Sequence, residues 1–355
     1  MTGVLPEADA VAAATGVTAT AYPNIALIKY WGKRDEALHL PVTSSLSLTL
    51  DIFPTVTTVA VADDLTGDEV RFASEDAADA PAPPPFSAKV TEFLDLVRVL
   101  AGDGRYARVR TGNAGPTAAG LASSASGFAA LAVAAAGAYG LELDRRALSR
   151  LARRGSGSAA RSLYGGFVQW HRGEGEGAAA DLSSYAEPIA APGLDPALVV
   201  ALVDAREKAI GSRAAMRSTV DTSPFYQPWV ESSAQDLRDM HTALAAGDLA
   251  AVGEVAERNA LGMHATMLGA RPAVRYFSPG SMRVLDRVLA LRAAGVAAYA
   301  TMDAGPNVKV LCDRRDNAAV AAALSETGVG RVLVATPGPG AIGGGLDGSS
   351  GHDHR

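Results

Sequence analysis

The chain has 355 residues, 48% hydrophobic and 20% charged, a composition typical of a globular protein with ample material for a core. Its formal net charge of −6 argues against nucleic acid or an anionic membrane surface as the main partner, so a local basic group must gather any anionic ligand. One cysteine, Cys312, excludes an internal disulfide, and residues 1–16 lack the pattern of a signal peptide, so we expect a cytoplasmic protein.

Three segments contain too many small, polar or proline residues to predict regular structure. Residues 1–16 and 336–355 are both expected to be disordered for this reason. Residues 74–87, SEDAADAPAPPPFS, are expected to form a loop, because proline disrupts both helices and sheets.

Strands and helices follow one another in the part of the chain before residue 195. Leu46, Leu48 and Leu50 alternate with polar residues, which predicts a strand with one buried face, and a second strand follows the break at Pro54. Asp144 is the expected N-cap of a helix that ends near Arg154. The patterns also predict helices over 88–100 and 126–139 and strands over 106–113, 165–171 and 197–205.

The last third of the chain is mainly helical before it returns to strands. A helical segment over 232–268 and a helix over 279–294 precede two strands joined by a short turn, then a helix near 317–325 and a final strand. This β-β-α-β order favours a helix-backed, mainly antiparallel sheet. We therefore predict an α+β protein with an N-terminal lobe over 17–195 and a C-terminal lobe over 196–335.

The segment AYPNIALIKYWGKRD, residues 21–35, contains two of the five lysines in a chain that has 27 arginines. On one extended stretch, Lys29 and Lys33 would project from the same side. Lysine carries a compact charge that suits a phosphate oxygen or a developing anion. The alternative is a solvated strand end in which the two lysines have no function.

The segment PTAAGLASSASG, residues 116–127, places a loop of small residues before a predicted helix. Free backbone N–H groups and the helix dipole at such a position hold phosphate, and Ser123 and Ser124 add hydroxyls for phosphate or Mg²⁺. No Gly-Lys-Ser/Thr follows, so this is not a Walker loop. A purely structural Gly/Ser/Ala loop is the alternative.

The segment RRGSGSAARSLYGGFVQW, residues 153–170, contains a second small-residue turn that leads into a helix. Arg161 lies three residues after Ser158, and its guanidinium there is suited to gripping a carboxylate through two hydrogen bonds. An ordinary helix cap followed by a surface arginine is the alternative.

The segment ATMDAGPNVKVL, residues 300–311, places Asp303 at the end of an apolar strand, just before a Gly-Pro-Asn turn. Aspartate commonly begins such turns, which is one reading of this residue. The other is a catalytic carboxylate at a strand end that faces a cleft.

Taken together and in order, NIALIKYWGKRD, LPVTSSLSLTL, PTAAGLASSASGFAAL, RRGSGSAARSLYGGFVQW and MDAGPN resemble the motifs of diphosphomevalonate decarboxylases, which belong to the GHMP small-molecule kinase superfamily. The resemblance runs from about Tyr22 to Val334. Sibling kinases usually carry Gly-Leu-Gly-Ser-Ser where this chain has Gly-Leu-Ala-Ser-Ser at 120–124. The chain departs from its relatives at Arg213, where they often have threonine, and the run SRAAM lacks their glycine.

The resemblance implies a two-lobed GHMP kinase fold, with a mixed α/β N-terminal lobe and an active site in the cleft between the lobes. It also implies ATP-dependent conversion of mevalonate 5-diphosphate to isopentenyl diphosphate, CO₂, ADP and phosphate, in a cytoplasmic homodimer that uses Mg²⁺. Phosphorylation of the 3-hydroxyl makes a leaving group, and its departure from C3 allows CO₂ loss to form the double bond.

Roles carried over by the resemblance fall into three groups. The catalytic residues are Asp303, Lys29, Arg161 and Asn24, with Arg161 and Asn24 orienting the carboxylate and Asp303 acting on the 3-hydroxyl as base or orienter. The residues that contact mevalonate diphosphate are Tyr30, Trp31, Gly32, Lys33, Ser156, Gly157, Ser158, Ala159, Ala160, Arg161, Ser212 and Arg213. The ATP-binding residues are Pro116, Ala119, Gly120, Leu121, Ala122, Ser123 and Ser124, of which Ser124 also contacts the metal.

Two other functions remain open at this point. One is a related GHMP enzyme, either a phosphomevalonate decarboxylase or a mevalonate 3-kinase that stops after phosphorylation. The other is a ligand sensor without catalytic activity on the same fold. Lys29, Arg161 and Asp303 together argue against a simple kinase. Ser124, Lys29 and Asp303 argue against a sensor.

Overall fold

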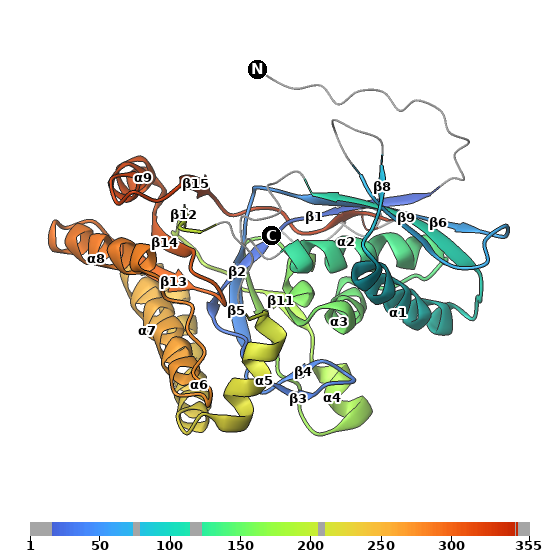
Figure 1. Cartoon of the computed structure of the whole chain (residues 1–355), viewed down its shortest axis with the longest axis horizontal. Coiled ribbons are helices and arrows are strands. Elements are labelled where there is room, and N and C mark those ends of the chain that lie inside the picture. Colours follow the sequence, from blue (N-terminus) through green and yellow to red (C-terminus); the bar gives the residue numbers. More distant parts are fainter. Residues whose placement is uncertain (1–15, 74–78, 114–122, 205–209, 345, 347–355) are drawn as a thin grey trace, which may run out of the picture.

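The computed structural model describes residues 16–73, 79–113, 123–204, 210–344 and 346. Two large sheets and three long helices form most of the N-terminal half, and a further sheet with two helices on each of its faces forms most of the C-terminal half (Figure 1). Among the described residues, no helix is both long and apolar enough to cross a membrane.

The first sheet has six strands in the order β16-β1-β6-β9-β7-β8 and is antiparallel except between β7 and β9. Its strands are β1 (Val17–Ala21), β6 (Thr55–Ala62), β7 (Glu69–Phe72), β8 (Ala80–Pro81), β9 (Tyr106–Asn113) and β16 (Ile342–Gly343). The helices α1 (Pro84–Ala101), α2 (Ser123–Ala138) and α3 (Arg145–Gly155) cover one face of this sheet (Figure 1). Asp144 caps α3 by accepting a hydrogen bond from the backbone N–H of Ala147, as its position in the sequence predicts.

Helix α1 corrects the prediction that residues 74–87 contain neither helix nor strand. Two prolines, Pro84 and Pro85, occupy the first turn of α1, and β8 lies within the same segment. Proline is tolerated in the first turn because the backbone N–H groups there have no partner within the helix. The same residue type that excludes a helix interior therefore marks a helix start here.

The second sheet has the order β11-β10-β5-β2, and its two faces differ in polarity. Its strands are β2 (Asn24–Ile28), β5 (Ser45–Thr49), β10 (Phe167–Trp170) and β11 (Ala186–Pro188). The predicted alternation in β5 is confirmed, because Leu46 and Leu48 enter a core shared with the C-terminal half. On the other face of the strand, Ser45 contacts the 3₁₀ helix η1 (Gly157–Leu163).

The third sheet, with the order β13-β14-β12-β15, is wholly antiparallel, as predicted. Its strands are β12 (Pro196–Leu202), β13 (Ala298–Met302), β14 (Val308–Asp313) and β15 (Arg331–Ala335). One face packs against α8 (Pro279–Ala293) and α9 (Asn317–Ser325), and the other against α6 (Tyr226–Ala246) and α7 (Leu249–Leu268). The pair α6–α7 also packs on β2, so one apolar core joins the second and third sheets.

The remaining elements are short or lie at the periphery. They are β3 (Lys33–Asp35), β4 (Leu40–Pro41), α4 (Gly177–Ser183), α5 (Ser212–Thr222) and the 3₁₀ helix η2 (Arg314–Asp316). The strands β3 and β4 form a hairpin that lies near α4 and α5 in the lower part of Figure 1.

The prediction that disorder begins at Thr336 is wrong for residues 336–344. Thr336 donates its backbone N–H and its hydroxyl to the carboxylate of Asp51, and β16 pairs with β1. A Cβ atom on Gly338 would lie 2.2 Å from the carbonyl oxygen of Leu50, so a glycine is required for this close approach. Small residues here serve packing rather than flexibility. Residues 1–15 and 347–355, also predicted to be disordered, lie outside the described residues.

Candidate active site

Two buried lysines hold one carboxylate where the second and third sheets meet. Lys29, the residue after β2, places its Nζ 2.8 Å from Oδ1 of Asp303, the residue after β13. The Nζ of Lys309, on β14, lies 3.0 Å from Oδ2 of the same carboxylate. Each lysine is 2% exposed, whereas the Asp303 side chain is 34% exposed, so a ligand can reach the carboxylate more easily than the lysines.

Burial and charge act in opposite directions on this cluster. Burial by itself raises the pKa of Asp303, but the charges and hydrogen bonds of Lys29 and Lys309 outweigh it and hold that pKa well below its usual range. Burial lowers the pKa of Lys29, and attraction to Asp303 offsets only part of that effect. Asp303 is therefore an anion at neutral pH, with a low intrinsic tendency to accept a proton.

Arg161 lies on η1 against the polar face of the second sheet. Its Nη1 donates to Oγ of Ser45 at 2.6 Å and its Nε donates to Oδ1 of Asn24 at 3.2 Å. Asn24 in turn donates to Oγ of Ser162 at 2.8 Å. Burial lowers the pKa of Arg161 to about 10, which still leaves the guanidinium charged at neutral pH. The structure thus brings the predicted pair Arg161 and Asn24 together and holds both rigidly.

The tyrosine between the two lysines of the first motif is enclosed but unpaired. Tyr30 makes an edge-to-face contact with Trp170, with ring centroids 4.8 Å apart, and Gly157 packs against its ring. Its hydroxyl is buried and has no hydrogen-bond partner among the described residues. Burial raises the pKa of Tyr30, so the hydroxyl stays protonated and available to donate to a ligand oxygen.

Gly32 corrects the prediction that Lys29 and Lys33 share one extended stretch. The strand β2 ends at Ile28, Gly32 has φ +115°, and β3 begins at Lys33, whose Nζ donates to Glu36 at 2.7 Å. The Tyr226 hydroxyl donates to the carbonyl of Trp31 at 2.9 Å, and a Cβ on Gly32 would lie 1.8 Å from that hydroxyl oxygen. A helix of the C-terminal half therefore sets the course of the chain between the two lysines.

The predicted phosphate loop and the second small-residue turn meet at their serines. Ser156 donates to Oγ of Ser124, which is exposed at the start of α2, at 3.4 Å, and its hydroxyl lies 3.5 Å from that of Ser158. Ala159 and Ala160 are fully buried, so their side chains serve packing. Ser123 begins α2, and the other predicted ATP-binding residues, Pro116, Ala119, Gly120, Leu121 and Ala122, lie outside the described residues.

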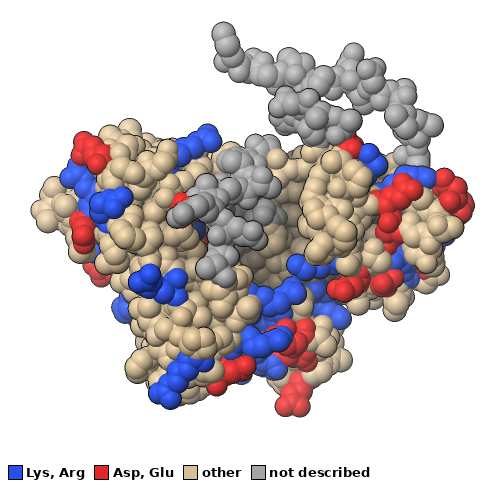
Figure 2. All heavy atoms as spheres, viewed as in Figure 1, with Lys and Arg blue, Asp and Glu red and all other residues tan. Residues whose placement is uncertain are grey.

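Basic side chains gather over the β3–β4 hairpin and α5, in the lower centre of Figure 2. Ser212 and Arg213 begin α5, and Arg213 is exposed. Burial, followed by the positive charge of Lys33, lowers the pKa of His39 to about 4, with a smaller contribution from Arg213. The positive charge of Arg217, also on α5, lowers the pKa of Glu36, as Lys33 does. An acidic chain thus concentrates positive charge here, as an anionic ligand requires.

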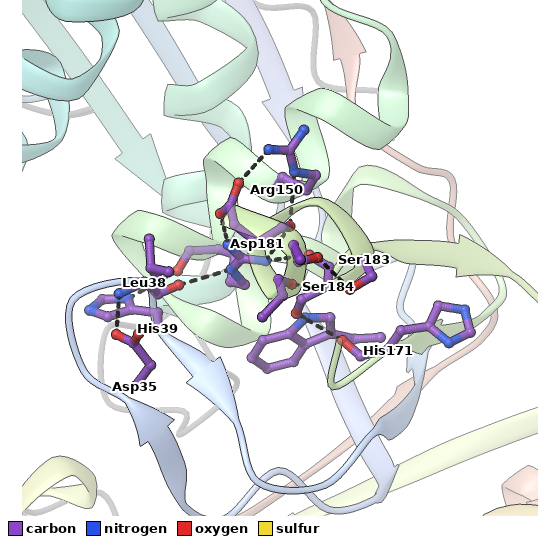
Figure 3. Close-up of polar contacts among 12 residues, drawn as sticks. Asp35, Leu38, His39, Arg150, His171, Asp181, Ser183 and Ser184 are labelled. Carbon is purple, nitrogen blue, oxygen red and sulfur yellow. Dashed lines mark hydrogen bonds and ion pairs between the residues drawn. The ribbon is translucent and has the colours of Figure 1, made fainter. Parts of the chain in front are cut away.

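A buried arginine supports the turn that carries Ser156. Arg153, in the last turn of α3, donates to the carboxylate of Asp181, to the carbonyl of Ser184 and, at 3.1 Å, to the carbonyl of Leu38. Its own carbonyl lies 3.0 Å from Nδ1 of His39. Figure 3 shows how Asp181, Ser184 and Leu38 converge from α4 and from the β3–β4 hairpin. These hydrogen bonds therefore hold the hairpin and the turn to one another.

Several residues of the site were missed by the sequence reasoning. Lys309 had a signal, because it is the one charged residue within the otherwise apolar run of β14, VKVLC. Ser45 had a weaker one, since it alternates with the leucines of β5. Asn259 accepts a hydrogen bond from the backbone N–H of Lys29, and Tyr226 donates one to the carbonyl of Trp31. No sequence signal identified either residue, because both lie on ordinary amphipathic helices.

The described residues contain no group of three or more His, Cys, Asp or Glu side chains that is able to hold a metal ion. The exposed hydroxyl of Ser124, at the start of α2, is the predicted protein contact for Mg²⁺. A serine hydroxyl at a helix start fits a magnesium ion that arrives with nucleotide phosphates and keeps most of its other ligands as water.

Models of two protein families match most of the chain. The diphosphomevalonate decarboxylase-like N-terminal domain matches residues 21–186, and the mevalonate 5-diphosphate decarboxylase C-terminal domain matches residues 198–330. The chain belongs to the diphosphomevalonate decarboxylase family. The two matches together span both the Lys29 and the Asp303 sides of the site.

Individual relatives agree with this assignment. The diphosphomevalonate decarboxylase of Rattus norvegicus is 39% identical over 312 residues, which cover 83% of this chain and 76% of the relative. The human enzyme of the same name is 38% identical over 315 residues, with the same shares covered. The sequence prediction of this family is therefore confirmed.

Solved structures of the family share the fold. The mevalonate diphosphate decarboxylase of Staphylococcus aureus superposes with a TM-score of 0.87 at 39% identity, covering 92% of this chain and 97% of that one. A structure of MDDEF in complex with MVAPP, AMPPCP and magnesium superposes with a TM-score of 0.86 at 45% identity, covering 92% and 98%. The predicted two-lobed α+β fold is confirmed.

Proposed function

We propose that this chain catalyses the ATP-dependent decarboxylation of mevalonate 5-diphosphate to isopentenyl diphosphate, CO₂, ADP and phosphate, as a carbon–carbon lyase of the mevalonate pathway. The observation that carries the proposal is the Asp303 carboxylate clamped between Lys29 and Lys309, in a chain of this family. The positive charges of Lys29 and Lys309 flank the negative charge of Asp303. In this proposal the transferred phosphoryl group and the 3-hydroxyl of the substrate meet beside these charges.

The chemistry explains why such a site needs both signs of charge. A β-hydroxy acid has no electron sink for losing CO₂, so its 3-hydroxyl must first become a leaving group. The 3-hydroxyl oxygen bonds to the γ-phosphorus of ATP as the bond to ADP breaks, and the hydroxyl proton passes to a phosphate oxygen. The C3–O bond then breaks with the electron pair leaving on phosphate. The C1–C2 bond electrons become the C2–C3 double bond as CO₂ departs. Anionic charge stabilises the electron-poor C3, and cationic charge stabilises the phosphoryl group.

Asp303 serves mainly as an anionic orienter in this proposal. Its pKa is held well below the usual range, so it is a weak proton acceptor. An ionised carboxylate still accepts a hydrogen bond from the 3-hydroxyl and aligns its oxygen. Phosphoryl transfer has a loose transition state that depends more on alignment and charge than on early proton removal. Lys29 then balances the charge of the phosphoryl group during transfer.

Arg161 and Asn24 are proposed to hold the carboxylate that becomes CO₂. Arg161 uses Nη1 and Nε within the protein, and an arginine has five N–H donors, so its remaining donors can bind an anion. The diphosphate is proposed to bind Tyr30, Lys33, the Ser156 and Ser158 hydroxyls, and the start of α5 at Ser212 and Arg213. The basic surface over the β3–β4 hairpin supports this placement.

ATP is proposed to bind at the start of α2, where the helix dipole and free N–H groups favour phosphate. Magnesium, held by the phosphates with Ser124, would neutralise charge on the transferring group. The relative solved with MVAPP, AMPPCP and magnesium supports this set of ligands. A homodimer, which rests on the family resemblance, and a cytoplasmic location, which rests on the sequence, remain proposals.

One assay distinguishes this function from its alternatives. Purified protein is given ATP, Mg²⁺ and, separately, mevalonate, its 5-phosphate or its 5-diphosphate, while ADP and CO₂ are both measured. We expect equal amounts of both products and the highest kcat/KM with the diphosphate, because extra charge-assisted hydrogen bonds position the substrate. ADP without CO₂ would indicate a 3-kinase. A preference for the monophosphate would indicate a phosphomevalonate decarboxylase, and no product with any substrate a sensor.

A further inference from the structure

The backbone of the proposed catalytic lysine is held by a side chain from the other half of the molecule. The N–H of Lys29 donates to Oδ1 of Asn259 at 2.8 Å, across 230 positions of sequence. Asn259 lies on α7 and is 1% exposed. The bond falls at the first residue after β2, so it fixes the backbone from which the lysine side chain starts.

The NH₂ group of the Asn259 side chain also has hydrogen-bond partners, and these determine how the amide is oriented. Its Nδ2 donates to Oδ2 of Asp236 at 2.9 Å and to Oγ of Ser233 at 3.1 Å, both on α6. Oδ1 of Asp236 accepts from Nε of Arg258 at 2.8 Å. A carboxylate only accepts, so it holds the NH₂ group of Asn259 toward α6 and directs the carbonyl oxygen toward Lys29. Asp236 is itself buried, at 5% exposed.

The helix α7 reaches both partners of the ion pair. It packs against β2, which leads to Lys29, and against β13, which leads to Asp303. Five residues after Asn259, the buried ring of His264 lies next to the backbone of Met302, the residue before Asp303. A single rigid helix therefore contacts the chain next to each charge.

We propose that Asn259, oriented by Asp236, is a positioning residue that holds Lys29 in register with Asp303. The inference rests on the proposed roles of Lys29 and Asp303 in phosphoryl transfer. Loss of the Asn259 oxygen leaves the buried N–H of Lys29 without a partner, so the end of β2 shifts to find one. A displacement of about 1 Å in a reacting group lowers turnover on the order of 100-fold.

The test compares Asn259→Ala with a matched variant on the same helix. Thr266 is also 1% exposed, but its hydroxyl bonds only to the carbonyl of Met263 within α7. We expect Asn259→Ala to lower kcat roughly 10- to 100-fold, with KM for ATP and for mevalonate 5-diphosphate within about 3-fold. Thr266→Val should keep kcat within about 2-fold. Wild-type kcat in Asn259→Ala, with only a lower melting temperature, would overturn the proposal.

A charge-neutral exchange separates positioning from packing. In Asn259→Asp, two carboxylates face each other and turnover should fall. In the double variant Asn259→Asp with Asp236→Asn, residue 259 still accepts from the Lys29 N–H and residue 236 donates to it, so we expect at least about 10-fold recovery over Asn259→Asp. A double variant no more active than Asn259→Asp would contradict the proposal.

A structural readout keeps this test independent of the proposed function. A crystal structure of Asn259→Ala should show Lys29 Nζ displaced from Asp303, and an unchanged ion pair at 2.8 Å would overturn the positioning role whatever the substrate. Failure of the wild-type protein to turn over mevalonate 5-diphosphate would instead count against the proposed function alone.

Discussion

The Nζ of Lys29 lies 2.8 Å from Oδ1 of Asp303, although 274 positions of sequence separate the two residues. Lys29 belongs to the N-terminal family domain and Asp303 to the C-terminal one, so the ion pair exists only when both domains are packed together. The pair therefore links correct assembly of the two domains to the proposed chemistry.

Asp303→Asn should remove almost all turnover and leave binding of ATP and mevalonate 5-diphosphate within a few-fold. The amide has no negative charge to stabilise C3 and no longer balances Lys29 and Lys309, and losses from such changes are on the order of 10²–10⁴-fold. Steady-state kinetics and calorimetric binding check this. Asp313→Asn, at the end of β14, is the matched control. A variant of Asp303 with more than about a tenth of wild-type kcat would remove it from the mechanism.

Lys309→Met should shift the acid side of the pH–rate profile upward. The pKa of Asp303 is depressed, so its carboxylate stays ionised when the pH falls below 3.8, the ordinary pKa of aspartate, and is protonated only at lower pH. Without Lys309, only Lys29 opposes the effect of burial, so the pKa of Asp303 rises. Protonation and the loss of activity then begin at a higher pH. We expect kcat to fall by about 10-fold at neutral pH. Lys89→Met, at an exposed position of α1, serves as the control. An unshifted acid limb would contradict the clamp.

Arg161→Gln should lower kcat on the order of 100-fold and change KM for mevalonate 5-diphosphate much less. The proposed partner of Arg161 is the departing carboxylate, whose alignment with the C3–O bond governs the chemical step. Ser45→Ala, which removes one anchor of the guanidinium, should give a smaller loss of the same kind. If only KM rises for Arg161→Gln, the residue serves simple binding.

Gly32→Ala should destabilise the fold by more than about 2 kcal/mol and raise KM for the diphosphate substrate. The new Cβ would meet the Tyr226 hydroxyl at 1.8 Å, and φ +115° strains any residue other than glycine. Tyr226→Phe alone should lose only about 1 kcal/mol with its hydrogen bond to Trp31. Combining both changes should recover part of the loss, because the clash is smaller. Denaturant unfolding measures each variant, and a fully stable Gly32→Ala would contradict this contact.

Ending the chain after Ala335 should destabilise it by about 3 kcal/mol or more, whereas ending it after Leu346 should have little effect. The longer deletion removes β16, the buried Ala341 and Leu346, and the Thr336–Asp51 hydrogen bonds. It also removes the carbonyl of Ala341, which accepts from Arg145 together with the carbonyl of Leu163 on η1. Equal stability of the two shortened chains would show that residues 336–346 contribute nothing to the fold.

Local sequence determined much of the architecture. The alternation of Leu46 and Leu48 with serines predicted which face of β5 is buried, and Asp144 predicted the start of α3. These predictions succeed because side-chain period and capping depend on residues a few positions apart. The motif around Asp303 also indicated a catalytic carboxylate, although its partners were only partly foreseen.

Tertiary packing decided the rest. Lys309 and Asn259 join the site because α7 lies between β2 and β13, and no local pattern encodes which helix fills that position. Small residues at 336–344 read as disorder, yet Gly338 is small because the backbone of Leu50 passes against it. The sequence does not distinguish a glycine that allows flexibility from a glycine that allows close contact. Only the presence or absence of a neighbour in space does so.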